Sequence, residues 1–289
     1  MRKNIWFFVT VAVLVAGASA YLGRGHLRDA YDAWRAPELP PAVPYQPTVR
    51  PVSSPSVPEG PSPFEPGHST SENFILETSP VVKAQPGGID LLAYEGPIPA
   101  SVNLDVPFTT QAPFTNWDMP YQEACEEASA IMVDAFYRGL TGTMEPLEAD
   151  GAILKLVAYQ KMTLGFYEDT TSEELAQVIR DYFGYRDVEV RPFGTGDDLK
   201  KVLAQGYPVI VPMAGKLLGN PNFRNGGPLY HMLVVRGYTP DYFITNDPGT
   251  RKGEGYTYDE ATILNAAHDW NGGNVTEGER LMIVVLPNP

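Results

Sequence analysis

Residues 120–139, PYQEACEEASAIMVDAFYRG, carry the pattern that decides the fold. A proline stands in the first turn and Gly139 follows the end, which predicts a helix over residues 120–138. Cys125, the single cysteine of the chain, lies near the start of this helix. It heads a face of small and apolar residues at Ala128, Ser129, Met132 and Phe136. The spacing therefore directs the thiol toward the rest of the fold.

The sequence around this stretch changes from helical to strand-like patterns. Further helices are predicted over residues 145–162, 172–183, 197–204 and 259–268, the second with a capping pattern of Thr171, Ser172 and Glu174. Strand composition follows over residues 188–190, 207–213, 230–238, 242–246 and 281–286. Helices followed by strands predict an α+β fold over residues 101–289, with a helical N-terminal half packed on a mostly antiparallel β-sheet.

Cys125 is the first candidate catalytic residue. At a helix start, unpaired backbone N–H groups and the helix dipole favour the thiolate. Glu126 and Glu127 act against this, although a helix is expected to direct their side chains away from the cysteine. The alternative is a core cysteine, a common location for this residue type. One cysteine also excludes an intrachain disulfide and a thiolate cluster.

His231 and Asp247 are the next candidates. A hairpin centred on Thr239 would pair His231 with Asp247 on one face of the sheet, where a carboxylate can orient the imidazole. A register shift of one residue would offer Asn246 instead. The alternatives are a histidine packed at a strand end and an aspartate in a turn before Pro248. Together, the thiol, histidine and aspartate favour nucleophilic catalysis by a triad.

Several short motifs carry a family resemblance. They are VPFTTQAP at 106–113, ACEEAS around Cys125, GYPVIVP at 206–212, YHMLVVRGY at 230–238 and TNDPG at 245–249. From about residue 103, the chain resembles the papain-fold cysteine peptidases related to bacteriocin leader peptidases, the peptidase family C thirty-nine-like group. The resemblance implies Cys125 as nucleophile, His231 as base and Asp247 as orienting residue.

The resemblance also implies an oxyanion-stabilising glutamine, whose amide would act with the backbone N–H of the cysteine. Gln111 matches that position, and Gln122 is the alternative. Leader-cutting members usually have glycine after the cysteine and a fused ATP-driven exporter. Here Glu126 follows the cysteine, and the sequence has no Gly-rich phosphate-binding loop, which argues against leader processing.

The N-terminal part has a different character. Residues 1–23 contain Arg2, Lys3 and a nearly uninterrupted apolar run, which suits either a signal anchor or a cleaved signal peptide. Residues 24–100 are expected to form a linker, with 11 prolines between residues 37 and 67. The sequence thus predicts an extracytoplasmic domain, either anchored in the membrane by the N-terminal segment or secreted.

The net charge of the chain limits the kinds of molecule it is expected to bind. The formal net charge is -14, and residues 101–289 contain 14 Lys and Arg against 26 Asp and Glu, which excludes nucleic acid as an expected partner. We expect a peptide or protein substrate, and no cofactor or metal. The leading hypothesis is an exported cysteine peptidase acting through a thioester intermediate. The alternatives are a peptidoglycan cross-peptide amidase and a non-catalytic cell-surface binding module.

Overall fold

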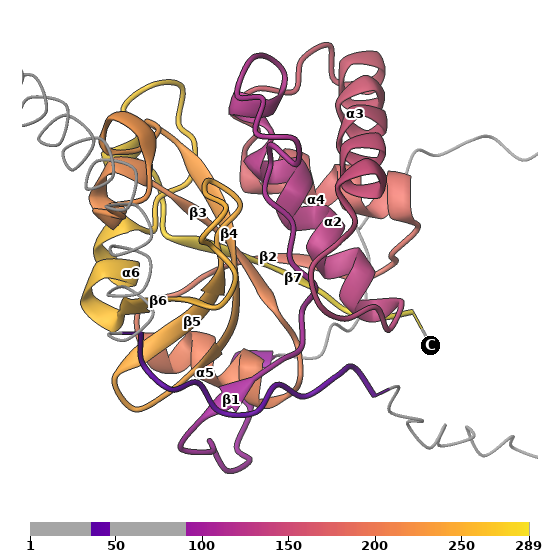
Figure 1. Ribbon diagram of the computed structural model, residues 1–289. Helices are drawn as coiled ribbons and strands as arrows, with labels where there is room; N and C mark the ends of the chain where they lie inside the picture. Colours follow the sequence, from indigo (N-terminus) through magenta and orange to yellow (C-terminus); the bar gives the residue numbers. More distant parts are fainter. Residues whose placement is uncertain (1–35, 47–90, 289) are drawn as a thin grey trace, which may run out of the picture. The chain divides into compact units, whose positions relative to one another are not determined.

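A computed structural model of the chain describes residues 36–46 and 91–288 (Figure 1). Of the described residues, 42–46 and 91–288 belong to one compact unit, and residues 36–41 contain no helix or strand. The apolar segment 1–23 and most of the proline-rich segment lie outside the described residues. Within the described ranges, no helix has the length and apolar character needed to cross a bilayer.

A seven-stranded sheet forms the centre of the domain. Its strands follow the order β2-β7-β3-β4-β5-β6, β1 pairs with β4, and every pair is antiparallel. The strands are β1 (Val102–Asn103), β2 (Val188–Pro192), β3 (Val209–Met213), β4 (His231–Tyr238), β5 (Tyr242–Asn246), β6 (Tyr256–Asp259) and β7 (Leu281–Val285). The strand β6 was not predicted, because YTYD is short and lacks a clear apolar pattern.

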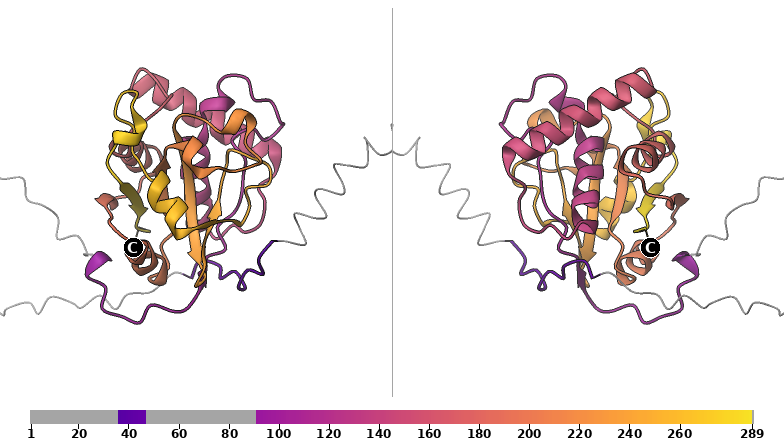
Figure 2. Two further views of the ribbon diagram at one scale, coloured as in Figure 1. Left: turned by 90° about the vertical axis from the view of Figure 1, so that its left-hand side faces the viewer. Right: turned by 90° about the vertical axis from the view of Figure 1, so that its right-hand side faces the viewer.

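Helices cover the sheet on both sides (Figure 1). The longer ones are α2 (Cys125–Tyr137), α3 (Pro146–Thr163), α4 (Ser172–Val178), α5 (Gly196–Ala204) and α6 (Glu260–Ala266). Short helical turns are η1 (Leu91–Ala93), η2 (Tyr121–Glu123), η3 (Ile179–Phe183), η4 (Gly215–Leu218), η5 (Arg224–Gly226) and η6 (Val275–Glu277). Helix α2 contacts β4 and α3, and α4 contacts β2 and β7. The predicted α+β fold, with a helical half on an antiparallel sheet, is confirmed (Figure 2).

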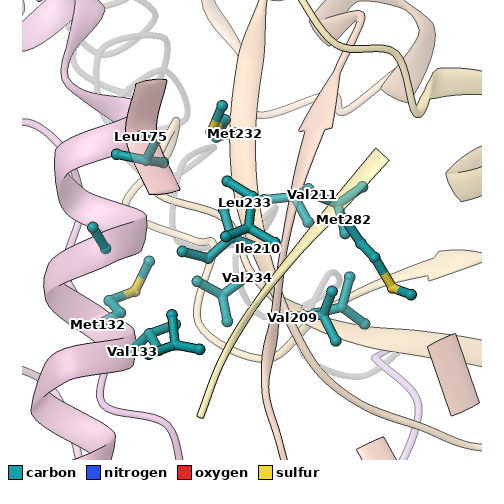
Figure 3. Packing of buried hydrophobic residues seen from close by; sticks show 14 of the residues in the cluster. Met132, Val133, Leu175, Val209, Ile210, Val211, Met232, Leu233, Val234 and Met282 are labelled. Atoms are coloured by element: carbon teal, nitrogen blue, oxygen red, sulfur yellow. The ribbon is translucent and has the colours of Figure 1, made fainter. Parts of the chain in front are cut away.

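The core lies between α2 and the central strands. Met132 and Val133 of α2 point toward Leu233 and Val234 of β4 (Figure 3). Every residue of β4 is buried, as expected for a central strand covered on both faces. This packing fixes the start of α2 beside the start of β4, and these two ends carry the cysteine and the histidine.

The predicted helix over residues 120–138 is divided into η2 and α2. Ala124 between them has a non-helical backbone, with φ −106° and ψ 28°. The side-chain amide of Gln111 donates to the carbonyl oxygens of Tyr121 and Gln122, at 2.9 and 3.0 Å. In a continuous helix these carbonyls would accept from the N–H groups of residues 125 and 126. The division therefore starts a new helix at Cys125, with the N–H groups of its first turn available.

The predicted register of the β4–β5 hairpin was wrong. Val234 pairs with Asn246, which lies two residues further along β5 than the partner predicted for Val234. On the turn side of the strand, each residue of β4 pairs with a residue three positions further along β5 than predicted. A three-residue shift would place Asp247 on the opposite face from His231. A bulge between Val235 and Gly237 returns the shift to an even number and restores the shared face.

Part of the expected linker packs against the domain. Val43 forms a parallel bridge with Leu104, donating to Asn103 O at 2.8 Å. The ring of Tyr45 lies 5.4 Å from that of Phe136, between centroids. Leu91 is completely buried. The predicted linker over residues 24–100 did not include these contacts, which belong to the compact unit.

Candidate active site

His231 and Asp247 form a buried pair. The Nε2 atom of His231 lies 2.8 Å from Oδ1 of Asp247, and both side chains are almost completely buried. A carboxylate can only accept, so Nε2 carries a hydrogen, and in the neutral ring the lone pair is on Nδ1. Nδ1 is buried and has no hydrogen-bond partner among the described residues. The imidazole is thus in the tautomer that can take a proton at Nδ1.

Asp247 is held by groups that sequence reasoning missed. Its Oδ2 accepts from the Tyr258 hydroxyl at 2.6 Å and from the Asn220 side chain at 3.4 Å, and its Oδ1 accepts from Gly249 N–H at 3.0 Å. Burial raises the pKa of Asp247, but the charge and hydrogen bond of His231, with the bonds from Tyr258 and Gly249, outweigh it and lower the pKa. Asp247 is therefore ionised. Tyr258 comes from β6, so no local signal pointed to it.

Cys125 lies at the first position of α2 with 5% of its surface exposed. The backbone N–H of Met232 interacts with its sulfur, so the thiol lies at the start of β4, where His231 is the preceding residue. The thiol donates to Oε2 of Glu126 at 3.0 Å. The expectation that Glu126 would point away from the cysteine was wrong, because the two side chains converge at the helix start.

The resting thiol is neutral. Burial, followed by the charge and hydrogen bond of Glu126, raises the pKa of Cys125 well above its ordinary value. The bond from Met232 N–H opposes this shift and is the smaller effect. The helix start alone had favoured the thiolate, but here desolvation and the neighbouring carboxyl dominate.

The two candidate oxyanion glutamines lie in different settings. Gln111 is buried, both N–H bonds of its amide are used by the η2 carbonyls, and its Oε1 has no partner among the described residues. Its backbone N–H donates to Pro248 O at 3.0 Å, which ties it to the turn after Asp247. Gln122 donates to Glu123 in a more exposed setting. In this arrangement Gln111 occupies carbonyls that a continuous helix would pair with the first N–H groups of α2, and its own amide is not free.

A cleft of about 330 Å³ lies beside the His231–Asp247 pair. One wall comes from the segment before α2, including Gln111 and Trp117, and the other from residues 223–228 and Gly249. The ring of Phe223 meets that of His231 edge-on, 5.4 Å away. A Cβ atom at Gly249 would lie 2.8 Å from Phe223 and 2.9 Å from His231, so only glycine allows this close approach.

Asn246, the alternative orienting residue, and His268 both interact with backbone carbonyls of other segments. The Asn246 amide donates to Val106 O and Pro107 O at 2.9 and 3.1 Å, so Asn246 does not orient His231. The Nδ1 atom of His268 lies 2.9 Å from Gly278 O. In the described residues, no cluster of His, Cys, Asp and Glu could hold a metal ion. Of the predicted residues, the structure brings together Cys125, His231, Asp247 and Gln111.

The α+β fold places a thiol at the start of α2 and a buried histidine–aspartate pair at the start of β4 and just beyond the end of β5. The model of the Peptidase C39-like family matches residues 103–273, and the chain belongs to this family. Family membership indicates a peptidase.

Comparison with solved structures gives a distant similarity. A crystal structure described as a candidate C39-like peptidase from Bacillus anthracis is 16% identical, with a TM-score of 0.43. It covers 65% of this chain and 98% of its own. No curated protein matches the sequence.

Proposed function

We propose that this protein is an exported, membrane-tethered cysteine peptidase that hydrolyses a peptide bond through Cys125, His231 and Asp247. The observation that carries the proposal is the buried His231, whose Nε2 is held by Asp247 and whose Nδ1 is unpartnered among the described residues. A buried imidazole with an unpartnered ring nitrogen, at the same end of β4 as the thiol, suits a general base.

The reaction begins when the thiol leaves Glu126 and gives its proton to Nδ1 of His231. The sulfur then attacks the carbonyl carbon, and the negative charge on the oxygen is stabilised by N–H groups at the start of α2. The C–N bond breaks, His231 returns the proton to the leaving amine, and a thioester with Cys125 remains. Water, deprotonated by His231, hydrolyses the thioester. Ionised Asp247 stabilises the imidazolium in both halves.

The cleft supports a peptide as substrate. Its walls combine the aromatic side chains of Trp117 and Phe223 with the polar Gln122 and Glu123. An extended chain presents apolar side chains and backbone polar groups in alternation, which such a lining accommodates. Gly227 and Gly249 keep one wall low, because neither carries a side chain.

Purified full-length protein incubated with a complex peptide mixture tests the activity. We expect new peptide termini, identified by mass spectrometry, that are absent with Cys125→Ala and His231→Ala. Purified peptidoglycan fragments form a second arm. Cleavage of those fragments alone would identify a cross-peptide amidase, and no cleavage in either arm would favour a binding module.

Export rests on the N-terminal apolar run and the proline-rich segment after it. An alkaline phosphatase fused after Pro289, which is active only outside the cytoplasm, tests it. We expect an active reporter that sediments with membranes. Activity only in the medium would indicate a cleaved signal, and an inactive reporter would contradict export.

A further inference from the structure

Glu126 is a buried acid in direct contact with the proposed nucleophile, and the mechanism above gives it no chemical role. Its Oε2 lies 3.0 Å from the Cys125 sulfur, and the residue is 1% exposed. A second buried carboxyl, Glu127, follows it and accepts from Gln160. Ionising two neighbouring carboxyl groups that are both fully buried costs free energy, because each charge loses its hydration and the two charges repel.

No cation compensates Glu126 in the described part of the chain, where none of the ion pairs involves it. The titratable groups that face it come from α2, η2, the segment before α4 and the start of β4. They are Cys125, Glu127, Glu123, Asp169 and Tyr230. None of these groups can carry a positive charge, so none of them compensates an ionised Glu126.

Burial raises the pKa of Glu126 to about 8, with smaller contributions from Asp169 and Glu123. The hydrogen bond from Cys125 and the backbone N–H at the helix start lower it, but desolvation is larger. A group with this raised pKa is neutral below about pH 8 and ionised above it. Glu126 is therefore mostly protonated at neutral pH.

The two protonation states have opposite effects on the sulfur. A neutral carboxyl can turn its O–H toward the sulfur and donate to the thiolate while His231 holds the thiol proton. An ionised carboxylate has no hydrogen to donate. It accepts the hydrogen bond of the neutral thiol, and it repels a thiolate at 3.0 Å. The same contact thus permits or prevents ionisation of the nucleophile.

We propose that Glu126 is a positioning residue that lets Cys125 ionise only while its own carboxyl carries a proton, so that the nucleophile is switched off under alkaline conditions. The inference rests on the proposed function, because it concerns transfer of the thiol proton to His231. The residue acts through the sulfur and touches no substrate.

Alkylation by iodoacetamide tests the switch without a known substrate. Full-length protein is alkylated from pH 6 to pH 10 and followed by mass spectrometry, which is unambiguous because Cys125 is the only cysteine. Glu126→Gln keeps a donor at every pH. We expect its rate to match the native rate near pH 6.5 and to exceed it about tenfold at pH 9, one unit above the titration of Glu126.

A second variant separates the effect of the hydrogen-bond donor at position 126 from the effect of the negative charge there. Glu126→Ala has neither, so its rate should be about tenfold below that of Glu126→Gln at pH 6.5 and show no alkaline suppression. Glu127→Gln is the matched control, a buried carboxyl one residue away that bonds Gln160 instead of the sulfur. It should leave the ratio of the rates at pH 9 and pH 6.5 within about threefold of the native ratio.

The outcomes separate the two proposals. The switch is overturned if the ratio of the alkylation rates of Glu126→Gln and native protein does not change with pH. If His231→Ala is also alkylated more slowly than native protein, the peptidase proposal still stands. An unchanged rate in His231→Ala overturns the thiol–imidazole pair itself, and the switch with it. If Glu126→Gln does not fold, the pH profile of Glu126→Ala decides, and alkaline suppression in that variant overturns the switch.

Discussion

Nε2 of His231 lies 2.8 Å from Oδ1 of Asp247, although the two residues are not cross-strand partners. Asp247 lies just beyond the end of β5, where its N–H donates to Gly253 O at 2.9 Å. The turn and the bulge in β4 together bring the carboxylate back to the histidine. The pairing therefore depends on two irregular features of the hairpin rather than on a regular ladder.

Substitutions at Asp247 and Asn246 should have different kinds of effect. Asp247→Asn removes the charge that holds the imidazole tautomer, and we expect kcat to fall by about two to four orders of magnitude. Asn246→Ala removes the hydrogen bonds from the Asn246 amide to the carbonyls of Val106 and Pro107, which should cost about 1–3 kcal/mol of stability and little kcat. Measuring kcat and the urea unfolding of each variant distinguishes a loss of catalysis from a loss of stability. A larger kcat loss in Asn246→Ala would contradict this assignment.

Tyr258→Phe should change the acid stability of the protein. It removes the 2.6 Å hydrogen bond to Asp247, a bond to a charged group, and should cost about 1.5–3 kcal/mol at neutral pH. The lowered pKa of Asp247 provides stability above the unfolded value of about 3.9, which is lost as the pH falls through the folded value. In Tyr258→Phe this loss should begin at a higher pH. Urea unfolding between pH 2.5 and 6 measures it, and identical pH profiles would refute the coupling.

Glu127 should make the native protein less stable at alkaline pH. Burial and then the charge of Glu126 raise the pKa of Glu127, so it is neutral in the folded state. The stabilisation is complete below the unfolded value of about 4.3 and is lost as the pH rises toward the folded value. We expect the unfolding free energy to fall between pH 5 and pH 9, and to fall less in Glu127→Gln.

Glu148→Gln, an exposed carboxyl in the first turn of α3, is the control for this measurement. It should retain the native difference between pH 5 and pH 9. An equal reduction of that difference in both variants would show that general surface charge, rather than the buried carboxyl, is responsible.

Residues before Ser101 should contribute to stability. Leu91 is completely buried, and Leu91→Ala should cost about 2–5 kcal/mol. A chain that begins at Ser101 lacks both Leu91 and Tyr45, whose ring lies 5.2 Å from that of Tyr137. We expect its urea midpoint to be well below that of the full chain. Equal midpoints would show that these contacts contribute nothing.

The sequence by itself determined the elements with strong local signals. The capping pattern at Thr171 predicted the start of α4, where Glu174 N donates to Thr171 Oγ1 at 3.3 Å and Thr171 N donates to Glu174 at 2.8 Å. The change from helical to strand patterns predicted the α+β fold. The hairpin pattern placed His231 and Asp247 on one face, which they share in the structure through a different register. Periodicity and capping are set by neighbouring residues, so they are visible in one sequence.

Only the tertiary structure decided the hairpin register, the split of the first helix and the partners of Asp247. The bulge lies beside Gly237, where a Cβ atom would come within 2.2 Å of Val102 O on β1. The split depends on Gln111, and Asp247 is held by Tyr258 from a strand with no clear pattern. Each depends on residues brought together from separate segments. Because their energies arise only once the sheet has assembled, local propensity could not predict them.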